Sequence, residues 1–156
     1  MKKITALLLA LIIALLAFTS CEYIFGSVGE SGTVTVVVEN ADGSLSVFEA
    51  ALSAVENKDN GAEGVLEHLS NKNDGLYLEM IDGGYGAYVT AIGSIKEIPS
   101  DGMYVIVYTS VKADSYEGAP TVDYRGTMMY QAGIGLSGMT VYDGTVILFR
   151  LEKSPY

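Results

Sequence analysis

The sequence predicts an α+β domain in which one main helix packs on one face of a sheet. Small or aliphatic residues alternate with polar and aromatic ones along 87–92 and 103–108, and this period of two is typical of strands. Apolar residues between 47 and 55 recur instead at helical spacing. A strand, a helix and then several strands, in this order, favour an α+β fold over alternating βαβ units.

The first part of the domain is predicted to form a strand, a turn and the main helix. Residues 33–39 alternate and are rich in β-branched side chains, so a strand is expected there. Its inward residues are Val34, Val36 and Val38. A turn is expected at 40–43. Ser46 and Glu49 have the spacing of a capping box, so the main helix is expected to begin at Ser46. A short second helix or turn is predicted near 65–69.

Further strands and turns are expected in the second half of the chain. The strands are predicted at 76–81, 87–92, 103–108, 121–124, 127–130 and 145–152. The segments 87–92 and 103–108 are interpreted as the middle of one sheet, with small and branched aliphatics on one face and tyrosines on the other. Arg125 and Gly126 lie between two short strands and predict a hairpin turn. Asp-Gly pairs fall between the periodic segments, which favours turns over metal ligation.

The N-terminal residues have the features of an export signal. Two lysines precede an apolar run at 6–18 that is too short to span about 30 Å of hydrocarbon as a helix. The run ends shortly before Cys21, and this pattern resembles the bacterial lipoprotein box. The resemblance implies a signal peptide at 1–20, lipid on Cys21 with a flexible tether at 21–32, and a domain at 33–152 outside the cytoplasm on the bacterial cell membrane. The alternative is an ordinary secretory signal with an incidental cysteine.

Composition limits the classes of partner. The chain of 156 residues has a net charge of −10, and loss of Lys2 and Lys3 with the signal changes the charge to −12. Such an acidic chain would be repelled by the phosphates of nucleic acid, which is therefore not expected as a partner. The chain has one cysteine and one histidine, so neither a disulfide nor a metal site is expected.

Several blocks of residues together resemble the transcobalamin-like C-terminal domain, which occurs as a domain of unknown function in bacterial surface lipoproteins. The blocks are 34–38, 46–52, 85–93, the strand after Gly102, and 141–147. The resemblance covers about residues 33–152 and implies a β-grasp-like mixed sheet that serves as a ligand-binding module. In the animal cobalamin carriers the related domain closes over cobalamin. Here the family's tryptophan is missing and 111–139 is a longer insert, so no cobalamin-contacting residue is carried over.

No set of residues predicts catalysis. Residues 133–138 match the glycine spacing of a dinucleotide fingerprint, but a helix is not expected after them, so they are interpreted as a flexible loop. The single histidine, His68, is interpreted as a solvent-facing helix residue. Asp82 and Asp101 are interpreted as turn residues, not as a pair of catalytic carboxylates. An enzyme is therefore not expected, and no cofactor is implied except cobalamin as a bound ligand.

Tyrosines are the candidate binding residues. The chain has 11 of them, and Tyr88, Tyr104 and Tyr108 are predicted to share one face of the sheet. Tyrosine combines a large, stiff contact area with a hydroxyl group, which suits a recognition surface. The alternative is that these rings only cover the second face of the sheet. The sequence thus favours a membrane-anchored module that binds a small molecule, and the alternative function is a structural or adhesive module that binds a protein or glycan.

Overall fold

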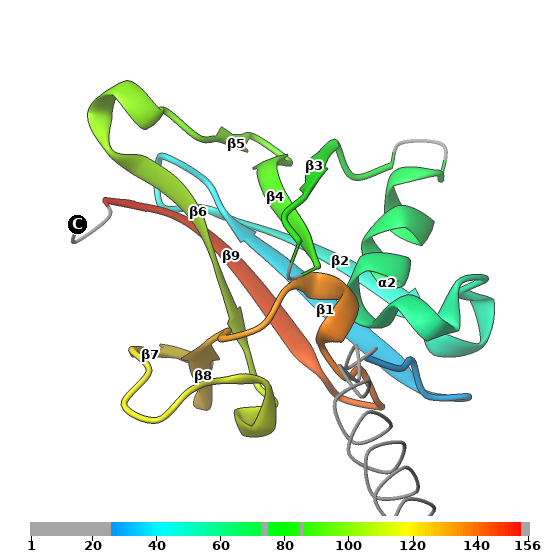
Figure 1. Ribbon diagram of the computed structural model, residues 1–156. Coiled ribbons are helices and arrows are strands. Elements are labelled where there is room, and N and C mark those ends of the chain that lie inside the picture. The colour runs from blue at the N-terminus through cyan, green and yellow to red at the C-terminus, as the bar shows by residue number, and fades with distance from the viewer. Residues whose placement is uncertain (1–25, 73–74, 85, 154–156) are drawn as a thin grey trace, which may run out of the picture.

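Figure 1 shows the computed structural model, which describes residues 26–72, 75–84 and 86–153. The predicted signal peptide and Cys21 lie outside these residues. The chain is mostly sheet with one main helix, so the predicted α+β class is confirmed. The strands are β1 (Thr33–Glu39), β2 (Leu45–Ala51), β3 (Leu78–Asp82), β4 (Ala87–Ile92), β5 (Ile95–Lys96), β6 (Met103–Thr109), β7 (Thr121–Tyr124), β8 (Thr127–Gln131) and β9 (Val146–Lys153). The main helix is α2 (Gly61–Ser70), and short 3₁₀ turns are η1 (Leu52–Ala54), η2 (Lys58–Asn60), η3 (Pro99–Asp101), η4 (Lys112–Asp114) and η5 (Leu136–Gly138).

The larger sheet is mixed and has six strands in the order β2-β1-β9-β6-β8-β7. Among the described residues, its one parallel pair is β1 and β9, which joins the first strand of the domain to the last. All other neighbours in this sheet are antiparallel. The strand predicted at 145–152 is confirmed, because Ile147 and Phe149 are fully buried on one face of β9.

The segment predicted as the main helix is a strand. Residues 45–51 form β2, which pairs with β1 along its whole length. Asn40 donates a hydrogen bond to the Ser46 hydroxyl, so this side chain supports the hairpin turn and does not cap a helix. The prediction was wrong because the apolar positions of this segment also alternate, and seven paired residues outweigh a weak helical preference.

The main helix lies where only a short second helix or turn was expected. It follows η2 and buries Val65, Leu66 and Leu69 in the principal core. The sequence predicted that His68 faces the solvent, but this residue is half-buried on the helix. The helix has no side-chain N-cap, so its position depends on packing.

The two strands expected in the middle of one sheet belong to different sheets. β4 pairs with β3 and β5 in a separate three-stranded sheet, whereas β6 lies in the larger sheet. Both strands alternate as predicted, but alternation does not identify the neighbours of a strand. The chain reverses after β4 at Gly93, whose positive φ of 57° suits glycine, and returns as β5.

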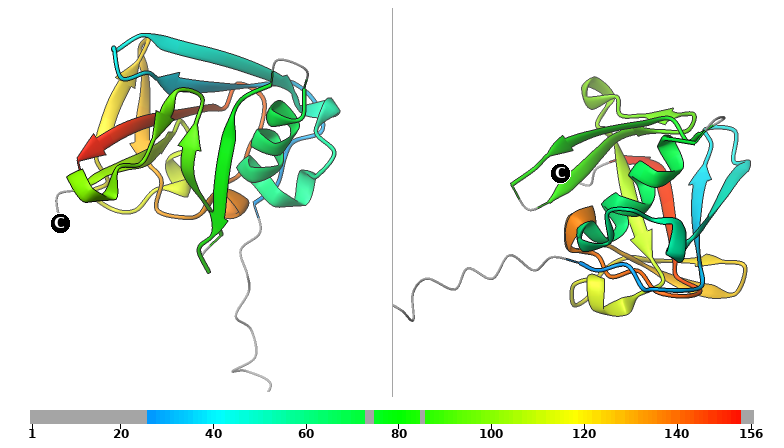
Figure 2. Two further views of the ribbon diagram at one scale, coloured as in Figure 1. Left: turned by 90° about the horizontal axis from the view of Figure 1, so that it is seen from above. Right: turned by 90° about the vertical axis from the view of Figure 1, so that its right-hand side faces the viewer.

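The principal core lies between the larger sheet on one side and α2 with the small sheet on the other. Figure 2 shows this layering from two directions. Val34, Val36 and Val38 of β1 point into this core as predicted, and they meet residues of both α2 and β4. Each fully buried aliphatic side chain of this kind contributes about 1.5–3 kcal/mol. We call the face of the larger sheet that carries them the inner face.

The opposite, outer face of the larger sheet carries a smaller cluster under the β7–β8 hairpin. Val37, Tyr108, Met129 and Leu148 are its buried members. The hairpin was predicted, and its turn residues Arg125 and Gly126 have φ angles of 51° and 83°. Positive φ at both central residues defines the tight turn whose twist matches paired strands.

The domain begins earlier than residue 33. Val28 is buried and bridges to Val141, and the Gly26 amide donates to the Ser137 carbonyl. A Cβ at Gly26 would collide with the Met139 carbonyl oxygen, so only glycine lets the backbone at residue 26 approach the backbone at Met139 this closely. The expected tether therefore ends before residue 26, and 26–29 belongs to the folded domain.

Candidate functional site

The three candidate tyrosines do not form one surface. Tyr88 lies on β4, on the small sheet, while Tyr104 and Tyr108 lie on β6 in the larger sheet. Tyr88 and Tyr104 are half-buried, and Tyr108 is only 2% exposed. The shared face was predicted from two strands that were expected to be neighbours, and this neighbour relation does not hold.

Tyr108 is held in the outer-face cluster. Its hydroxyl lies 3.2 Å from both carboxylate oxygens of Glu152, to which it donates. Burial and then the Glu152 charge raise the pKa of Tyr108 to about 12. Arg150 lies between Glu39 and Glu152 and completes a row of charges beside the ring. This geometry assigns Tyr108 to packing.

Tyr88 instead joins the small sheet to the edge of the larger one. Its hydroxyl donates to the Oε1 atom of Glu97, and the same oxygen accepts the Val105 N–H of β6 at 3.1 Å. Burial, followed by the Glu97 hydrogen bond and charge, raises the pKa of Tyr88. The phenol therefore stays neutral at physiological pH and acts as a donor.

A cleft of about 160 Å³ opens beside Tyr88, where the two sheets separate. β6 pairs with β8 only through Tyr108 and Thr109, so the chain after β8 turns away from β6. Side chains from β4, from β6 and from the segment after β8 form the walls. They are Ala87, Tyr88, Val89, Val105, Ile106, Val107, Gln131, Ala132, Ile134, Gly135 and Leu136. Most of the lining is aliphatic, with Tyr88 and Gln131 as the polar side chains.

The far wall of the cleft comes from the glycine-rich segment 133–138. This segment ends in η5 and packs against α2, and Leu136 is buried in the principal core. The dinucleotide fingerprint is not supported, because η5 is a single turn that lacks the strand and the helix such a site needs. Ser137 accepts a hydrogen bond from the Ala87 amide and so fixes this wall to β4. Apart from the density of glycine, no pattern in the sequence indicated the cleft.

Asp114 accepts hydrogen bonds from residues near both ends of the glycine-rich segment 133–138. It is 5% exposed, its carboxylate accepts the Thr140 N–H at 3.1 Å, and its carbonyl accepts the Gly133 N–H at 2.9 Å. Burial raises the pKa of Asp114 to about 6, although the hydrogen bond from Thr140 opposes this shift. Asp114 therefore titrates near neutral pH while it holds the ends of the cleft-lining segment.

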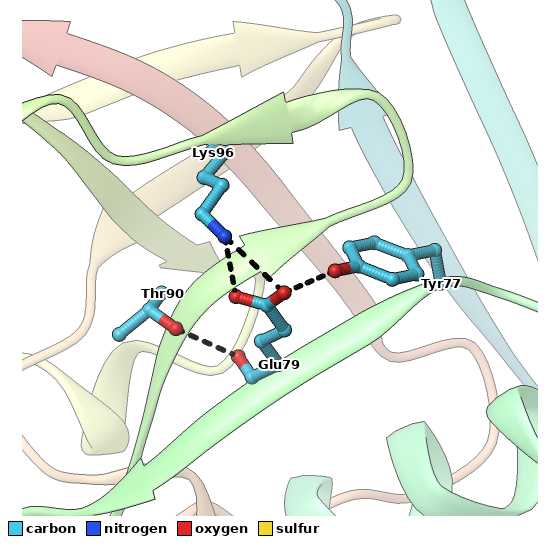
Figure 3. A network of polar contacts seen from close by, with 4 residues as sticks. All are labelled: Tyr77, Glu79, Thr90 and Lys96. Carbon is cyan, nitrogen blue, oxygen red and sulfur yellow. Dashed lines mark hydrogen bonds and ion pairs between the residues drawn. The ribbon is translucent and has the colours of Figure 1, made fainter.

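A polar network covers the solvent side of the small sheet, as Figure 3 shows. Lys96 of β5 pairs with Glu79 of β3 at 2.9 Å, Tyr77 donates to Glu79, and Thr90 donates to the Glu79 carbonyl. The Lys96 and Glu79 side chains are 65% and 39% exposed. An exposed pair of this kind contributes about 0–1 kcal/mol, so the network aligns three strands more than it stabilises them.

In the described part of the chain, no group of three or more His, Cys, Asp or Glu residues is placed to hold a metal. Among the same residues, no helix has the length and apolar character that crossing a bilayer requires. Asp82 and Asp101 are both exposed, and they are the last residues of β3 and of η3.

Comparison with known proteins gives a structural match. No family model matches the sequence, and no curated protein matches it. The fold is similar to the crystal structure of a "putative metal binding protein" from Ruminococcus gnavus ATCC 29149, with a TM-score of 0.53 and 18% identity. The match covers 79% of this chain and 98% of that one. At this identity it shows the fold alone. The metal-binding description stays with that protein.

Proposed function

We propose that this chain is a lipid-anchored module outside the cytoplasm that binds a small ligand, without catalysis, in the cleft between β4 and β6. The cleft itself is the observation that carries the proposal. It is concave, mainly aliphatic and bordered by a few polar groups, which is the usual composition of a ligand site. A flat apolar patch would have favoured an adhesive role instead.

The strand order supports the β-grasp-like part of the proposal. A hairpin of β1 and β2 precedes α2, and β1 lies parallel to the last strand, β9. β6 lies on the other side of β9. A mixed sheet in which the first and last strands are parallel, with one hairpin and one helix, agrees with the β-grasp-like fold that the resemblance to the transcobalamin-like C-terminal domain implies.

The size of the cleft limits the ligand. Sites for drug-sized ligands measure about 300–1,000 Å³, and the cleft is about 160 Å³. It suits a molecule of a few heavy atoms, or one protruding group of a larger ligand. Cobalamin belongs to the second case, and it would place one peripheral amide group in the cleft while its ring stayed outside.

A second candidate function is supported by a different surface. Tyr77 and Ile81 on the solvent side of β3 are 54% and 55% exposed. Exposed aromatic and aliphatic residues beside the Lys96–Glu79 pair favour contact with a protein or glycan. This would be the adhesive role that the sequence left open.

The ligand can be sought by purifying the full-length protein in detergent and identifying the small molecules that remain bound by mass spectrometry. Ala132 lines the cleft and is half-buried, so Ala132→Leu should fill it. We expect a bound molecule in the wild type and its loss in Ala132→Leu, with Thr121→Leu on the exposed face of β7 as the control. Absorbance titration with cyanocobalamin tests that ligand directly. A ligand that survives Ala132→Leu would place the site elsewhere.

The anchor is tested separately. Cells that express the full gene are fractionated, and the protein is followed in the membrane and soluble fractions. Cys21→Ser should move it out of the membrane fraction, because the lipid would have no attachment point. Retention equal to wild type would show that Cys21 is not the anchor.

A further inference from the structure

One edge of β6 leaves two backbone groups without partners inside the cleft. Odd-numbered residues of β6 direct their N–H and C=O groups away from β9, as the Val105 N–H bond to Glu97 and the Ala132 N–H bond to the Val107 carbonyl both show. The Val107 N–H and the Val105 C=O must therefore point to the same side. Neither group belongs to the ladder with β9 or with β8, and among the described residues no turn, loop or side chain bonds to either of them. The two groups flank Ile106, which lines the cleft.

This pair has the geometry of an open position in a β-ladder. In a parallel pair, one residue of the added strand donates its N–H to residue i−1 and accepts from the N–H of residue i+1. With Ile106 as residue i, these groups are the Val105 C=O and the Val107 N–H. A buried backbone group without a partner is unfavourable, so a ligand that pairs both groups gains specificity as well as affinity.

A carboxylate without a counter-ion lies at the start of the same edge. Glu97 is half-buried, and its Oε1 already accepts from Val105 and Tyr88, both of which line the cleft. No lysine, arginine or histidine nitrogen within the described ranges lies within 4.0 Å of it, whereas Glu30, Glu39, Glu79 and Glu152 all have such partners. The chain as a whole has a net charge of −10. Both facts favour a cationic group at this end of the cleft.

We propose that the cleft binds a short extended peptide with a free amino terminus, which adds to the edge of β6 as a parallel strand. The first residue of the peptide pairs with the Val105 C=O and the Val107 N–H, so its side chain lies on the same face as Ile106. The side chain of the second residue points to the opposite face, that of Val105 and Val107, and enters the aliphatic cleft. A parallel strand runs from the Val105 side to the Val107 side, so its amino terminus lies toward Glu97. An antiparallel strand would place its carboxyl terminus there, against a like charge.

The volume of the cleft agrees with this occupant. A volume of about 160 Å³ equals the share of roughly five water molecules, at about 30 Å³ each. This is enough for one aliphatic side chain together with the backbone that carries it. The inference rests on the proposed function, because it names the class of ligand for the same cleft.

The test uses full-length protein in detergent micelles and calorimetric titration with tripeptides that carry alanine, valine, leucine or methionine between two alanines. Each peptide is compared with its N-acetylated form. At least one free-amine peptide should bind, and acetylation should weaken it about tenfold or more, because a desolvated charge pair is lost. In Glu97→Gln the amide oxygen still accepts from Val105 and Tyr88, and the difference between the two peptide forms should fall to about threefold or less. Glu79→Gln, on the solvent side of the same sheet, should leave the tenfold difference unchanged.

Hydrogen exchange followed by mass spectrometry supplies the second readout. The wild type with bound peptide should exchange more slowly in 103–109, and Ala132→Leu should abolish both binding and this protection. Equal binding of free and acetylated peptides would overturn the assignment of the amino terminus to Glu97. If no peptide binds but a co-purified molecule is lost in Ala132→Leu, the peptide inference fails and the cleft remains a ligand site. If neither is observed, the proposed function fails as well.

Discussion

The two faces of the larger sheet are built from the same strands but are covered in different ways. The inner face meets α2 and the small sheet and forms one continuous apolar core, in which Phe149 is the largest fully buried side chain. Within the described residues, the outer face is covered by the β7–β8 hairpin, and its cluster has four buried residues, one of them Tyr108. The inner face buries more apolar residues and therefore supplies most of the stability, whereas the outer face has one fully buried aromatic ring, Tyr108, beside a row of charges.

This difference shows where a site can form. The inner face is closed where α2 lies on it, but the small sheet diverges from β6 and leaves the cleft at the margin. On the outer face the Tyr108 hydroxyl is already satisfied by Glu152, so this face has little left to offer a ligand. The cleft is found where the inner layer ends, and the tyrosine that borders it is Tyr88.

Neighbouring alanines on β2 give the largest expected contrast between the faces. Ala50 is 0% exposed on the inner face, while Ala51 is exposed. Ala50→Asp would bury an unpaired carboxylate and should lower the free energy of unfolding by several kcal/mol. Ala51→Asp should lower it by about 0.5 kcal/mol or less. Urea denaturation measures the free energy of unfolding of both variants. An equal loss for Ala51→Asp and Ala50→Asp would contradict strand β2 and favour the helix that the sequence predicted.

Truncation of Tyr108 measures how much the outer face contributes. Tyr108→Ala should leave a cavity in the outer cluster and lower the free energy of unfolding by about 3–5 kcal/mol. Tyr104→Ala, on the same side of β6 but half-buried, should cost about 1 kcal/mol or less. Chemical denaturation separates the two. A small loss at Tyr108 would mean that the outer face is open enough to bind a partner.

Asp114 should make the attachment of the cleft wall depend on pH. Its folded pKa of about 6 exceeds the unfolded value of about 3.9, so the unfolded chain loses its proton first as pH rises. The stability that protonated Asp114 provides is therefore present below about pH 4 and is lost as pH rises through 6. Asp114→Asn keeps an acceptor for Thr140 and should gain about 1–3 kcal/mol over wild type between pH 4 and 7. Urea midpoints at both pH values test this, with exposed Glu117→Gln as the control, and parallel pH curves for wild type and Asp114→Asn would refute it.

The hairpin turn should give the smallest effect. Arg125 is a non-glycine residue at a φ of 51°, where asparagine is more favourable, but its guanidinium lies 5.4 Å from the Tyr124 ring. Arg125→Asn relieves the backbone and loses this contact, so the midpoint of thermal unfolding should rise only slightly, by an amount equal to about 0.5 kcal/mol. A fall of more than about 1 kcal/mol would show that the ring contact holds the hairpin.

Much of the strand pattern could be predicted from the sequence because alternation is a local signal. β1, β4, β6, the β7–β8 hairpin and β9 were all expected within a few residues of their bounds. The observed secondary structure differs from the predicted one where the residues of a segment fit two patterns. Residues 45–51 fit both a helix and a strand, and pairing with β1 decides between them. Residues 61–70 include two glycines, and only a short helix or turn was expected near 65–69, yet packing against the core makes 61–70 the main helix.

The candidate site was harder to predict because it depends on which strands are neighbours. Tyr88 was named from its place in a strand, and it does line the cleft. Val105, Val107 and Glu97 could not be recognised, since their role comes from backbone groups left free where β8 turns away from β6. No residue spacing in the sequence indicates that β8 separates from β6 at this point.

The close packing of Gly26 against the segment after η5 has a consequence for reach. If Cys21 carries lipid as proposed, only five residue steps separate the membrane from the fixed point at Gly26, and a fully extended chain covers about 3.6 Å per step. The domain could then rise no more than roughly 18 Å from its anchor. Ser137, whose carbonyl accepts the Gly26 amide, directly follows Leu136 in the cleft wall. The opening of the cleft would therefore lie within a few nanometres of the lipid headgroups. Ligands would have to be small or flexible enough to enter this narrow layer.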